Sequence, residues 1–492
     1  MTSSPSLPPS AGSPRRVVVV GGGISGLSAA YRLTVGAAER GLPIELSLLD
    51  VGEQPGGVIS TADRDGFVME EGPDCFLSIK PAATALCKEL GLDGQIIGTN
   101  PNFRQSFVVR DGRLHPLPEG FYLLAPSKFW PFVTTPIISW PGKLRMGLDL
   151  LLPRRRGGAD ESLADFVLRR LGREALDRLA QPMVGGIYTA DPAMLSLRAT
   201  MPQFLEMEEQ HRSVIWAMWK ARVAREKSQR SMGQARGPRY DLFLTLRGGL
   251  SQLIGALLRR LPPGTVRSRA RVTGMAGRPG GGFALQVEGQ PPVEADAVCL
   301  AVPAYVASKV MGGVDAAAAG ELAGIQYASS IVVHVNFNRQ DVPHPLDGMG
   351  FVVPAIENRT LLACSFSSNK FEGRAPEGQA LFRCFCGGAM RPDLWALSDT
   401  SLVDAILRDL RELLGIEATP RFAMVSRHQS SMAQYNVGHL DRVARIEGRE
   451  QLLPGLALAG NAFRGVGMGD CIASGNRAAE RLLDYLSAQR PG

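Results

Sequence analysis

The sequence lacks the residue patterns of metal centres and disulfide frameworks. Its 492 residues include only seven cysteines and six histidines, with no CxxC pair and no histidine cluster at metal-ligand spacing. We therefore interpret the cysteines as reduced thiols of a cytoplasmic protein and expect no metal site. In "LFRCFCGG", Cys384 and Cys386 would share one face of a strand, where core packing explains them better than metal binding.

The sequence also lacks a hydrophobic run long enough to cross a bilayer. Residues 118–152 concentrate Phe, Trp, Leu and Pro, but the uncharged stretch from Phe129 to Gly142 is only 14 residues long and is interrupted by prolines. Such a segment suits a patch that makes the protein peripheral on the cytoplasmic face of the membrane, or the wall of a substrate channel. A loop buried against the core is an equal alternative.

Positive charge is concentrated in one stretch. The net charge is +7, and residues 220–239 are rich in Lys and Arg without interleaved aromatic residues. This composition predicts a mobile loop and no nucleic-acid partner. Residues 1–13, rich in Ser and Pro, are expected to form a disordered leader.

What the sequence does contain begins with "VVVVGGGISGLSAAYRL". Val17–Val20 predict a buried strand, and a helix is expected over residues 24–33. Gly21 would permit the tight turn, Gly23 the approach of a pyrophosphate, and Gly26 close packing of helix on strand. A second strand, "IELSLLD", ends in Asp50, whose carboxylate would accept hydrogen bonds from a ribose. The two together predict a dinucleotide site.

A second glycine-rich turn lies near the other end of the chain. In residues 452–483 a strand is followed by Gly460, several further glycines and a helix predicted to begin near Asp470. The N-terminus of that helix could place its free N–H groups and positive dipole end on the pyrimidine edge of a reduced flavin. No Ser/His/Asp set or paired carboxylates stand out, as expected where a flavin carries the chemistry.

Several motifs resemble a large FAD family that includes amine oxidases, phytoene desaturases and porphyrinogen oxidases. "EQPGGVISTADRDGFVMEEGPDCF" is similar to its second glycine pair. "EEGPDCF", "QPMVGGIYTADPAMLSLRATMPQFLEMEEQHRSVI", "QYNVGH" and "GVGMGDCIASG" together resemble the protoporphyrinogen oxidases, from about Arg16 to the C-terminal helix. The resemblance implies bound, non-covalent FAD held by Gly21, Gly22, Gly23, Ile24, Ser25, Gly26, Asp50, Gly56, Gly57, Val58, Gly72, Pro73, Asp74, Cys75, Val272, Gly460, Val466, Gly467 and Met468.

The fold expected from this resemblance is α/β, or α+β overall, in several separated pieces. A Rossmann-like FAD-binding domain would comprise residues 14–100, 241–309 and 441–487, with a Gly-Gly segment opening a helix in residues 241–261 and a β-meander before Pro303. Residues 310–440 would form a β-sheet substrate domain. Residues 101–240 would form a helical, membrane-contacting subdomain, in which Ser162 and Asp165 predict a helix start and Gly172 its end.

The implied reaction removes six electrons from protoporphyrinogen IX in haem biosynthesis. Hydride would pass from a meso carbon to the flavin in three cycles, each reoxidised by oxygen with release of hydrogen peroxide. The resemblance places Met349, Gly350 and Phe366 beside the macrocycle, although each is also a plausible core or turn residue. Arg104 is the nearest candidate for the arginine that meets a propionate, about two residues out of register.

Alternative functions and partners stay open. Coproporphyrinogen III, with two more propionates, would react by the same mechanism, whereas an amine oxidase would need an aromatic cage. A prenyl-protein escort uses the same fold without redox chemistry, and it would be colourless. The partners considered are the porphyrinogen, oxygen and a membrane surface, together with a homodimer and the next enzyme of the haem pathway.

Overall fold

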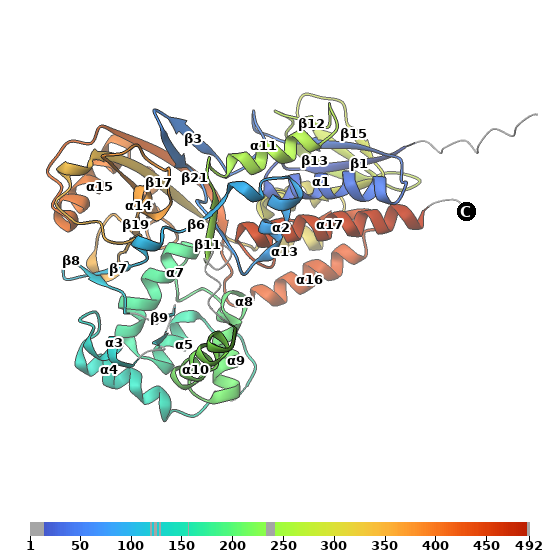
Figure 1. Cartoon of the computed structure of the whole chain (residues 1–492). Coiled ribbons are helices and arrows are strands. Elements are labelled where there is room, and N and C mark those ends of the chain that lie inside the picture. Colours follow the sequence, from blue (N-terminus) through green and yellow to red (C-terminus); the bar gives the residue numbers. More distant parts are fainter. Residues whose placement is uncertain are drawn as a thin grey trace, which may run out of the picture.

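The molecule has three regions, which Figure 1 separates clearly. A computed structural model describes residues 14–118, 121–122, 125–126, 129–155, 157–232 and 242–489. A parallel sheet with flanking helices lies on one side, a seven-stranded sheet lies on the other, and helices from the middle of the chain lie below them. The predicted α/β class is confirmed. The predicted leader, residues 1–13, falls outside the described residues.

The parallel sheet is assembled from strands that are distant in the chain. Its order is β12 (Val266–Arg267), β2 (Ile44–Leu49), β1 (Arg15–Val20), β16 (Ala297–Leu300) and β22 (Leu456–Leu458), and every neighbouring pair is parallel. The valines of β1 are almost fully buried, as is typical of a central parallel strand.

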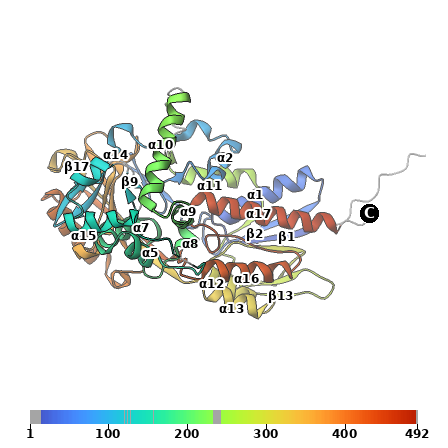
Figure 2. The same cartoon turned by 90° about the horizontal axis from the view of Figure 1, so that it is seen from below.

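Two long helices pack side by side beneath this sheet. They are α1 (Ile24–Glu39) and α17 (Met468–Ala488), and both views show them adjacent (Figures 1 and 2). A Cβ built on Gly475 of α17 would overlap the carbonyl oxygen of Ser25. The two helices therefore touch backbone to backbone, which requires glycine at this position.

Smaller elements connect the parallel strands. The predicted meander is present as β13 (Val272–Gly277), β14 (Phe283–Val287) and β15 (Val293–Ala295). β3 (Thr61–Arg64) pairs with β4 (Phe67–Glu70), and β11 (Phe243–Leu246) lies between β5 (Phe76–Leu77) and β6 (Ile96–Gly98). Five more helices complete the region around the parallel sheet: α2 (Pro81–Glu89), α11 (Ser251–Arg260), α12 (Ala304–Met311), α13 (Ala316–Ala323) and α16 (His439–Gln451).

The seven-stranded sheet has the order β21, β17, β20, β19, β18, β7, β8. These strands are β21 (Phe422–Ala433), β17 (Tyr327–Asn338), β20 (Gln379–Gly387), β19 (Ala363–Phe366), β18 (Gly350–Val352), β7 (Ser106–Arg110) and β8 (Arg113–Pro116), accompanied by α14 (Ser367–Lys370) and α15 (Asp399–Leu414). Strands β7 and β8 fall in the range expected to be helical, so a helical region beginning at residue 101 is wrong. Parallel pairing of β7 with β18, which is distant in the chain, places them in this sheet.

The helical region begins after β8. It contains α3 (Phe129–Thr134), α4 (Trp140–Gly147), α5 (Leu163–Arg170), α6 (Arg173–Ala175), α7 (Gln181–Tyr188), α8 (Leu197–Thr200), α9 (Pro202–His211), α10 (Val214–Met232) and the short pair β9 (Phe121–Tyr122) and β10 (Ala125–Pro126). Ser162 caps α5 by accepting the N–H of Asp165, as predicted. Within the described ranges, no helix has the length and apolar character needed to cross a membrane.

Two further features of the helical region are its basic stretch and a buried ion pair. Residues 220–232 of the basic stretch are part of α10, so a loop over that part is wrong; residues 233–241 lie outside the described residues. Arg170 and Asp149 form a fully buried ion pair, in which the guanidinium Nε donates to a carboxylate oxygen at 2.6 Å.

Candidate functional site: an FAD cradle

The turn between β1 and α1 has the geometry that its glycines predict. Gly21 has φ +103°, and a Cβ on Gly26 would overlap the carbonyl oxygen of Gly21. At Gly23, by contrast, a Cβ would meet no atom within 4 Å. Gly21 and Gly26 thus allow the turn and the helix packing, while Gly23 faces open space at the N-terminus of α1. That terminus has no side-chain cap, which leaves its N–H groups for a phosphate.

The carboxylate of Asp50 holds this turn in place. One of its oxygens accepts the N–H of Gly22 at 2.6 Å, and the other accepts the N–H of Gly52 at 2.8 Å. A carboxylate oxygen can accept a further hydrogen bond, so these contacts leave room for a ribose hydroxyl. Asp50 therefore orients the glycine turn in addition to the nucleotide role predicted for it.

The second glycine pair closes onto the first. The N–H of Gly56 donates to the carbonyl of Gly22 at 2.8 Å, and a Cβ on Gly57 would lie 3.1 Å from the Cα of Gly23. Val58, next in the chain, leaves 45% of its side chain exposed. An exposed apolar side chain beside glycines could form one wall of a pocket for a flat aromatic cofactor.

The C-terminal turn completes a surface that we call the cradle, formed by residues 21–26, 56–58 and 460–468. α17 begins at Met468, two residues before the predicted start, and Gly467 caps it without a side-chain hydrogen bond. Gly460 and Gly465 have φ +133° and +134°. The hydroxyl of Tyr435 accepts the N–H of Gly465 and donates to the carbonyl of Asn461, both at 2.7 Å. Tyr435, which fixes this loop, lies in the "QYNVGH" motif but was not predicted as a site residue.

The remaining predicted cofactor residues border the same region. Ala270, two residues before Val272, donates its N–H to the carbonyl of Asp50 at 2.7 Å, which places Val272 on the nucleotide side. A Cβ on Gly72 would overlap the carbonyl oxygen of Val58, so the segment from Gly72 to Cys75 packs against the second glycine pair. Burial raises the pKa of the Cys75 thiol to about 12, so it stays protonated at neutral pH. These residues together fit FAD.

The four predicted substrate residues have neighbouring backbones. The N–H of Met349 donates to the carbonyl of Gln105 at 2.7 Å, next to the exposed Arg104, and the carbonyl of Met349 accepts the N–H of Phe366 at 2.9 Å. A Cβ on Gly350 would overlap the carbonyl oxygen of Cys364 on β19, which by itself requires glycine.

The ring of Phe366 lies in the core of the seven-stranded sheet. It is fully buried, with its ring centroid 5.7 Å from that of Phe382 and 6.0 Å from those of Phe351 and His344. In this arrangement the ring has no face left for a pyrrole. Its contacts favour the core alternative over stacking on the substrate.

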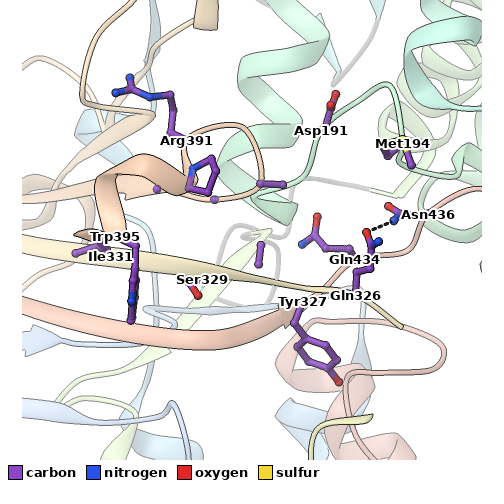
Figure 3. Close-up of a pocket in the computed structure, with 15 residues that line it drawn as sticks. Asp191, Met194, Gln326, Tyr327, Ser329, Ile331, Arg391, Trp395, Gln434 and Asn436 are labelled. Carbon is purple, nitrogen blue, oxygen red and sulfur yellow. Dashed lines mark hydrogen bonds between the residues drawn. The ribbon is translucent and has the colours of Figure 1, made fainter. Parts of the chain in front are cut away.

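A cavity of about 410 Å³ lies between the α7–α8 connection and the seven-stranded sheet (Figure 3). None of the predicted substrate residues lines it. Its wall includes Met194, Gln326, Tyr327, Trp395 and Gln434. Tyr327 connects it to the cradle, because its hydroxyl accepts the N–H of Ala304 at 2.9 Å and lies 3.5 Å from the Asn461 side chain. Composition alone carries no signal for these residues, since they come from distant segments.

This fold and cradle define a flavin-dependent oxidoreductase. The chain belongs to the flavin-containing amine oxidoreductase family, which it matches over residues 24–483, and within it to the group of the porphyrinogen oxidases. It is 36% identical to a coproporphyrinogen III oxidase of Propionibacterium freudenreichii subsp. freudenreichii, over 96% of this chain and 92% of that protein. It is 34% identical to a coproporphyrinogen III oxidase of Bacillus subtilis (strain 168), over 96% of this chain and 98% of that protein.

A solved structure agrees with these relatives. The crystal structure of a provisionally assigned protoporphyrinogen oxidase from Exiguobacterium sp. 255-15 has a TM-score of 0.83 and 30% identity, and it covers 95% of this chain and 98% of its own. The cofactor predicted from the sequence, FAD, is confirmed by this family membership.

Replacing Gly23 tests the cradle. Gly23→Val would place an isopropyl group in the open space, where its Cβ would meet no protein atom within 4 Å. We therefore expect loss of bound FAD with little change in the melting temperature of the apoprotein. Flavin absorbance per chain measures this. Gly448→Val, at another glycine whose Cβ would meet no atom, is the matched control and should keep its flavin. A Gly23→Val protein with full flavin content would move the pyrophosphate elsewhere.

Truncating Phe366 tests the core assignment. Phe366→Ala would leave a cavity among Phe351, Phe382 and His344, and we expect it to lower the free energy of unfolding by about 3–5 kcal/mol. Denaturant titration measures this, with Ile356→Ala on the surface as control, since Ile356 is 51% exposed. An unchanged free energy of unfolding, combined with a loss of about 2–4 kcal/mol in kcat/KM, would instead place the ring against the substrate.

Proposed function

We propose that this FAD-dependent oxidoreductase oxidises a porphyrinogen to the corresponding porphyrin in haem biosynthesis. The observation that carries the proposal is 34–36% identity, over 96% of the chain, to two coproporphyrinogen III oxidases, together with a cradle that fits FAD. Six electrons leave the substrate in three two-electron cycles, and oxygen accepts them with release of hydrogen peroxide. Bound FAD supplies the two-electron acceptor.

The chain's own residues bind and orient rather than react. The N-termini of α1 and α17 have no side-chain cap. Their free N–H groups would hold the pyrophosphate and the pyrimidine edge of the cofactor. Asp50 fixes the turn that brings Gly23 to the cofactor. The thiol of Cys75, with its raised pKa, stays neutral and offers no nucleophile.

Coproporphyrinogen III is the substrate that we favour over protoporphyrinogen IX. Both curated relatives named above carry that substrate in their names, and their identities of 34% and 36% exceed the 30% of the protoporphyrinogen-named structure. The sequence motifs, which suggested protoporphyrinogen IX first, do not by themselves separate the two substrates.

Side-by-side turnover of the two porphyrinogens tests this assignment. We expect kcat/KM to be about tenfold or more higher for coproporphyrinogen III, because a site built to pair four carboxylates leaves polar groups unpaired when two are missing. Porphyrin fluorescence and peroxide formation are followed together. The Gly23→Val protein serves as the control for spontaneous oxidation of the substrate.

Three other outcomes would contradict the proposal. Reversed turnover would favour protoporphyrinogen IX, and equal turnover would remove the preference for either porphyrinogen. Turnover of amines but of neither porphyrinogen would indicate an amine oxidase. A protein that stays colourless after FAD is added would indicate a scaffold without redox chemistry.

We also infer that the helical region contacts a membrane surface. Four apolar residues recur at helical spacing over α4 and the turn after it: Trp140, Leu144, Leu148 and Leu151. Their side chains are 64%, 73%, 46% and 72% exposed. Exposed apolar side chains gathered on one helix face are typical of an interfacial contact. The net charge of +7 would favour a surface of anionic lipid.

Sedimentation with anionic vesicles tests the membrane contact. Trp140→Ser with Leu144→Ser should weaken binding by about tenfold or more, because burying each such side chain contributes about 1.5–3 kcal/mol. Leu452→Ser, at an equally exposed leucine at the end of α16, is the control and should bind like the parent. If both variants sediment equally, the α4 face is not the contact.

A further inference from the structure

A cluster of buried charged side chains lies where the segment after β4 meets the seven-stranded sheet. Its carboxylates are Glu70 and Asp74, and its cations are Lys370 at the end of α14, Arg374, and Arg383 on β20. Glu70 and Arg374 are each 3% exposed, while Asp74 keeps 16%. Burying charged groups costs free energy unless they are paired, so we asked what these pairs hold in place.

Asp74 is held from two sides. The Lys370 ammonium donates to its Oδ2 at 2.7 Å, and a guanidinium nitrogen of Arg383 lies 3.6 Å from the same oxygen. Burial by itself would raise the pKa of Asp74, but these two cations outweigh it and lower the pKa well below its usual range. Asp74 is therefore a carboxylate throughout the working pH range.

Arg383 fixes the backbone of the same segment. Its Nε donates to the carbonyl of Glu70 at 3.1 Å, and a second nitrogen donates to the carbonyl of Gly72. Together with the contact to Asp74, these bonds join the whole segment from Glu70 to Asp74 to β20. A rigid segment here matters because Gly72 packs directly on the carbonyl oxygen of Val58.

The segment from Glu70 to Asp74 is linked to the open space of the cradle through Val58. Val58 follows Gly57, whose Cβ position lies 3.1 Å from the Cα of Gly23. A shift of Asp74 would therefore pass through Gly72 and Val58 to the glycines that line the cradle. Contacts of this kind transmit small displacements because packed backbone has little room to absorb them.

Positive and negative side chains are balanced in number around this segment. The cations Lys370, Arg374 and Arg383 face Glu70 and Asp74, and Glu71, which lies between those two carboxylates in the chain, accepts hydrogen bonds from Ser60 and Ser426. His334, opposite Arg383 in the register of β17 and β20, adds no charge. Burial, reinforced by Arg383, lowers the pKa of His334 to about 3. Removing one charge from such a balanced and poorly solvated set leaves an uncompensated charge, and a positive one favours an electron-rich group nearby over an electron-poor one.

We propose that Asp74 is a positioning residue, clamped by Lys370 and Arg383, which sets both the fit of FAD in the cradle and the reduction potential of the bound flavin. The proposal rests on FAD occupying this cradle and not on which porphyrinogen is oxidised. Lys370 adds a positive charge that stabilises the reduced flavin, and Asp74 moderates it.

Two single variants should move the flavin potential in opposite directions. Asp74→Asn removes the negative charge and should raise the midpoint potential of the bound flavin, and Lys370→Met removes a positive charge and should lower it. Asp74→Asn should also weaken FAD binding by about tenfold or more, because the segment loses its charged anchor. Dye equilibration measures the potential, and flavin titration of the apoprotein measures affinity, both without any porphyrinogen.

The double variant and a distant ion pair provide the controls. Asp74→Asn combined with Lys370→Met restores the balance of charge and should return the potential toward that of the parent. Asp149→Asn breaks the buried pair with Arg170 in the helical region, so it should lower the melting temperature without moving the potential.

A structural role alone would give a different result. If Asp74→Asn and Lys370→Met lower the melting temperature as Asp149→Asn does, but leave potential and FAD affinity unchanged, the proposal is overturned. Lys370→Met leaves Asp74 paired with Arg383, so it should fold even if Asp74→Asn does not, and an unchanged potential in that variant alone would suffice to reject the idea. Failure of porphyrinogen turnover would leave these measurements intact.

Discussion

Close contact between backbones at glycine positions is the constraint on which the cradle depends. Gly26 lies against the carbonyl of Gly21, Gly475 against that of Ser25, and Gly72 against that of Val58. The first contact closes the turn between β1 and α1, and the other two bring α17 and the segment after β4 to the same space. Each of the three positions is closed to any residue with a Cβ. The open space at Gly23 exists because the surrounding backbones are held this tightly.

Local signals in the sequence predicted the parts of the site that are local in the chain. These parts depend on residues a few positions apart. They are the strand, turn and helix from Val17 onward, Asp50 at the end of β2, and the capping of α5 by Ser162. Tight turns and helix starts require particular residues, so glycines and capping residues in the sequence predict them. The assignment of each residue to FAD remains a prediction.

Contacts between distant segments could not be predicted in this way. β7 joins β18 more than 200 residues later in the chain, and nothing in "SFVVR" names that partner. The alternation around Phe366 is the same whether its ring faces a ligand or the core, and only the packing on Phe382 and Phe351 distinguishes them. The clamp on Asp74 joins residues from the first and last third of the sequence, so each member appears in the sequence as an isolated charge.

The order of strands in the parallel sheet has a consequence for how the protein is made. β1 occupies the centre of that sheet, yet β22 and α17 come from the far end of the chain. A ribosome must therefore release almost the entire polypeptide before the last strand can pair and the second helix N-terminus can reach the cradle. Contacts of such long sequence separation form slowly. Until then the face of α1 that packs on α17 stays uncovered, so the complete cradle forms only after nearly the whole chain has been synthesised.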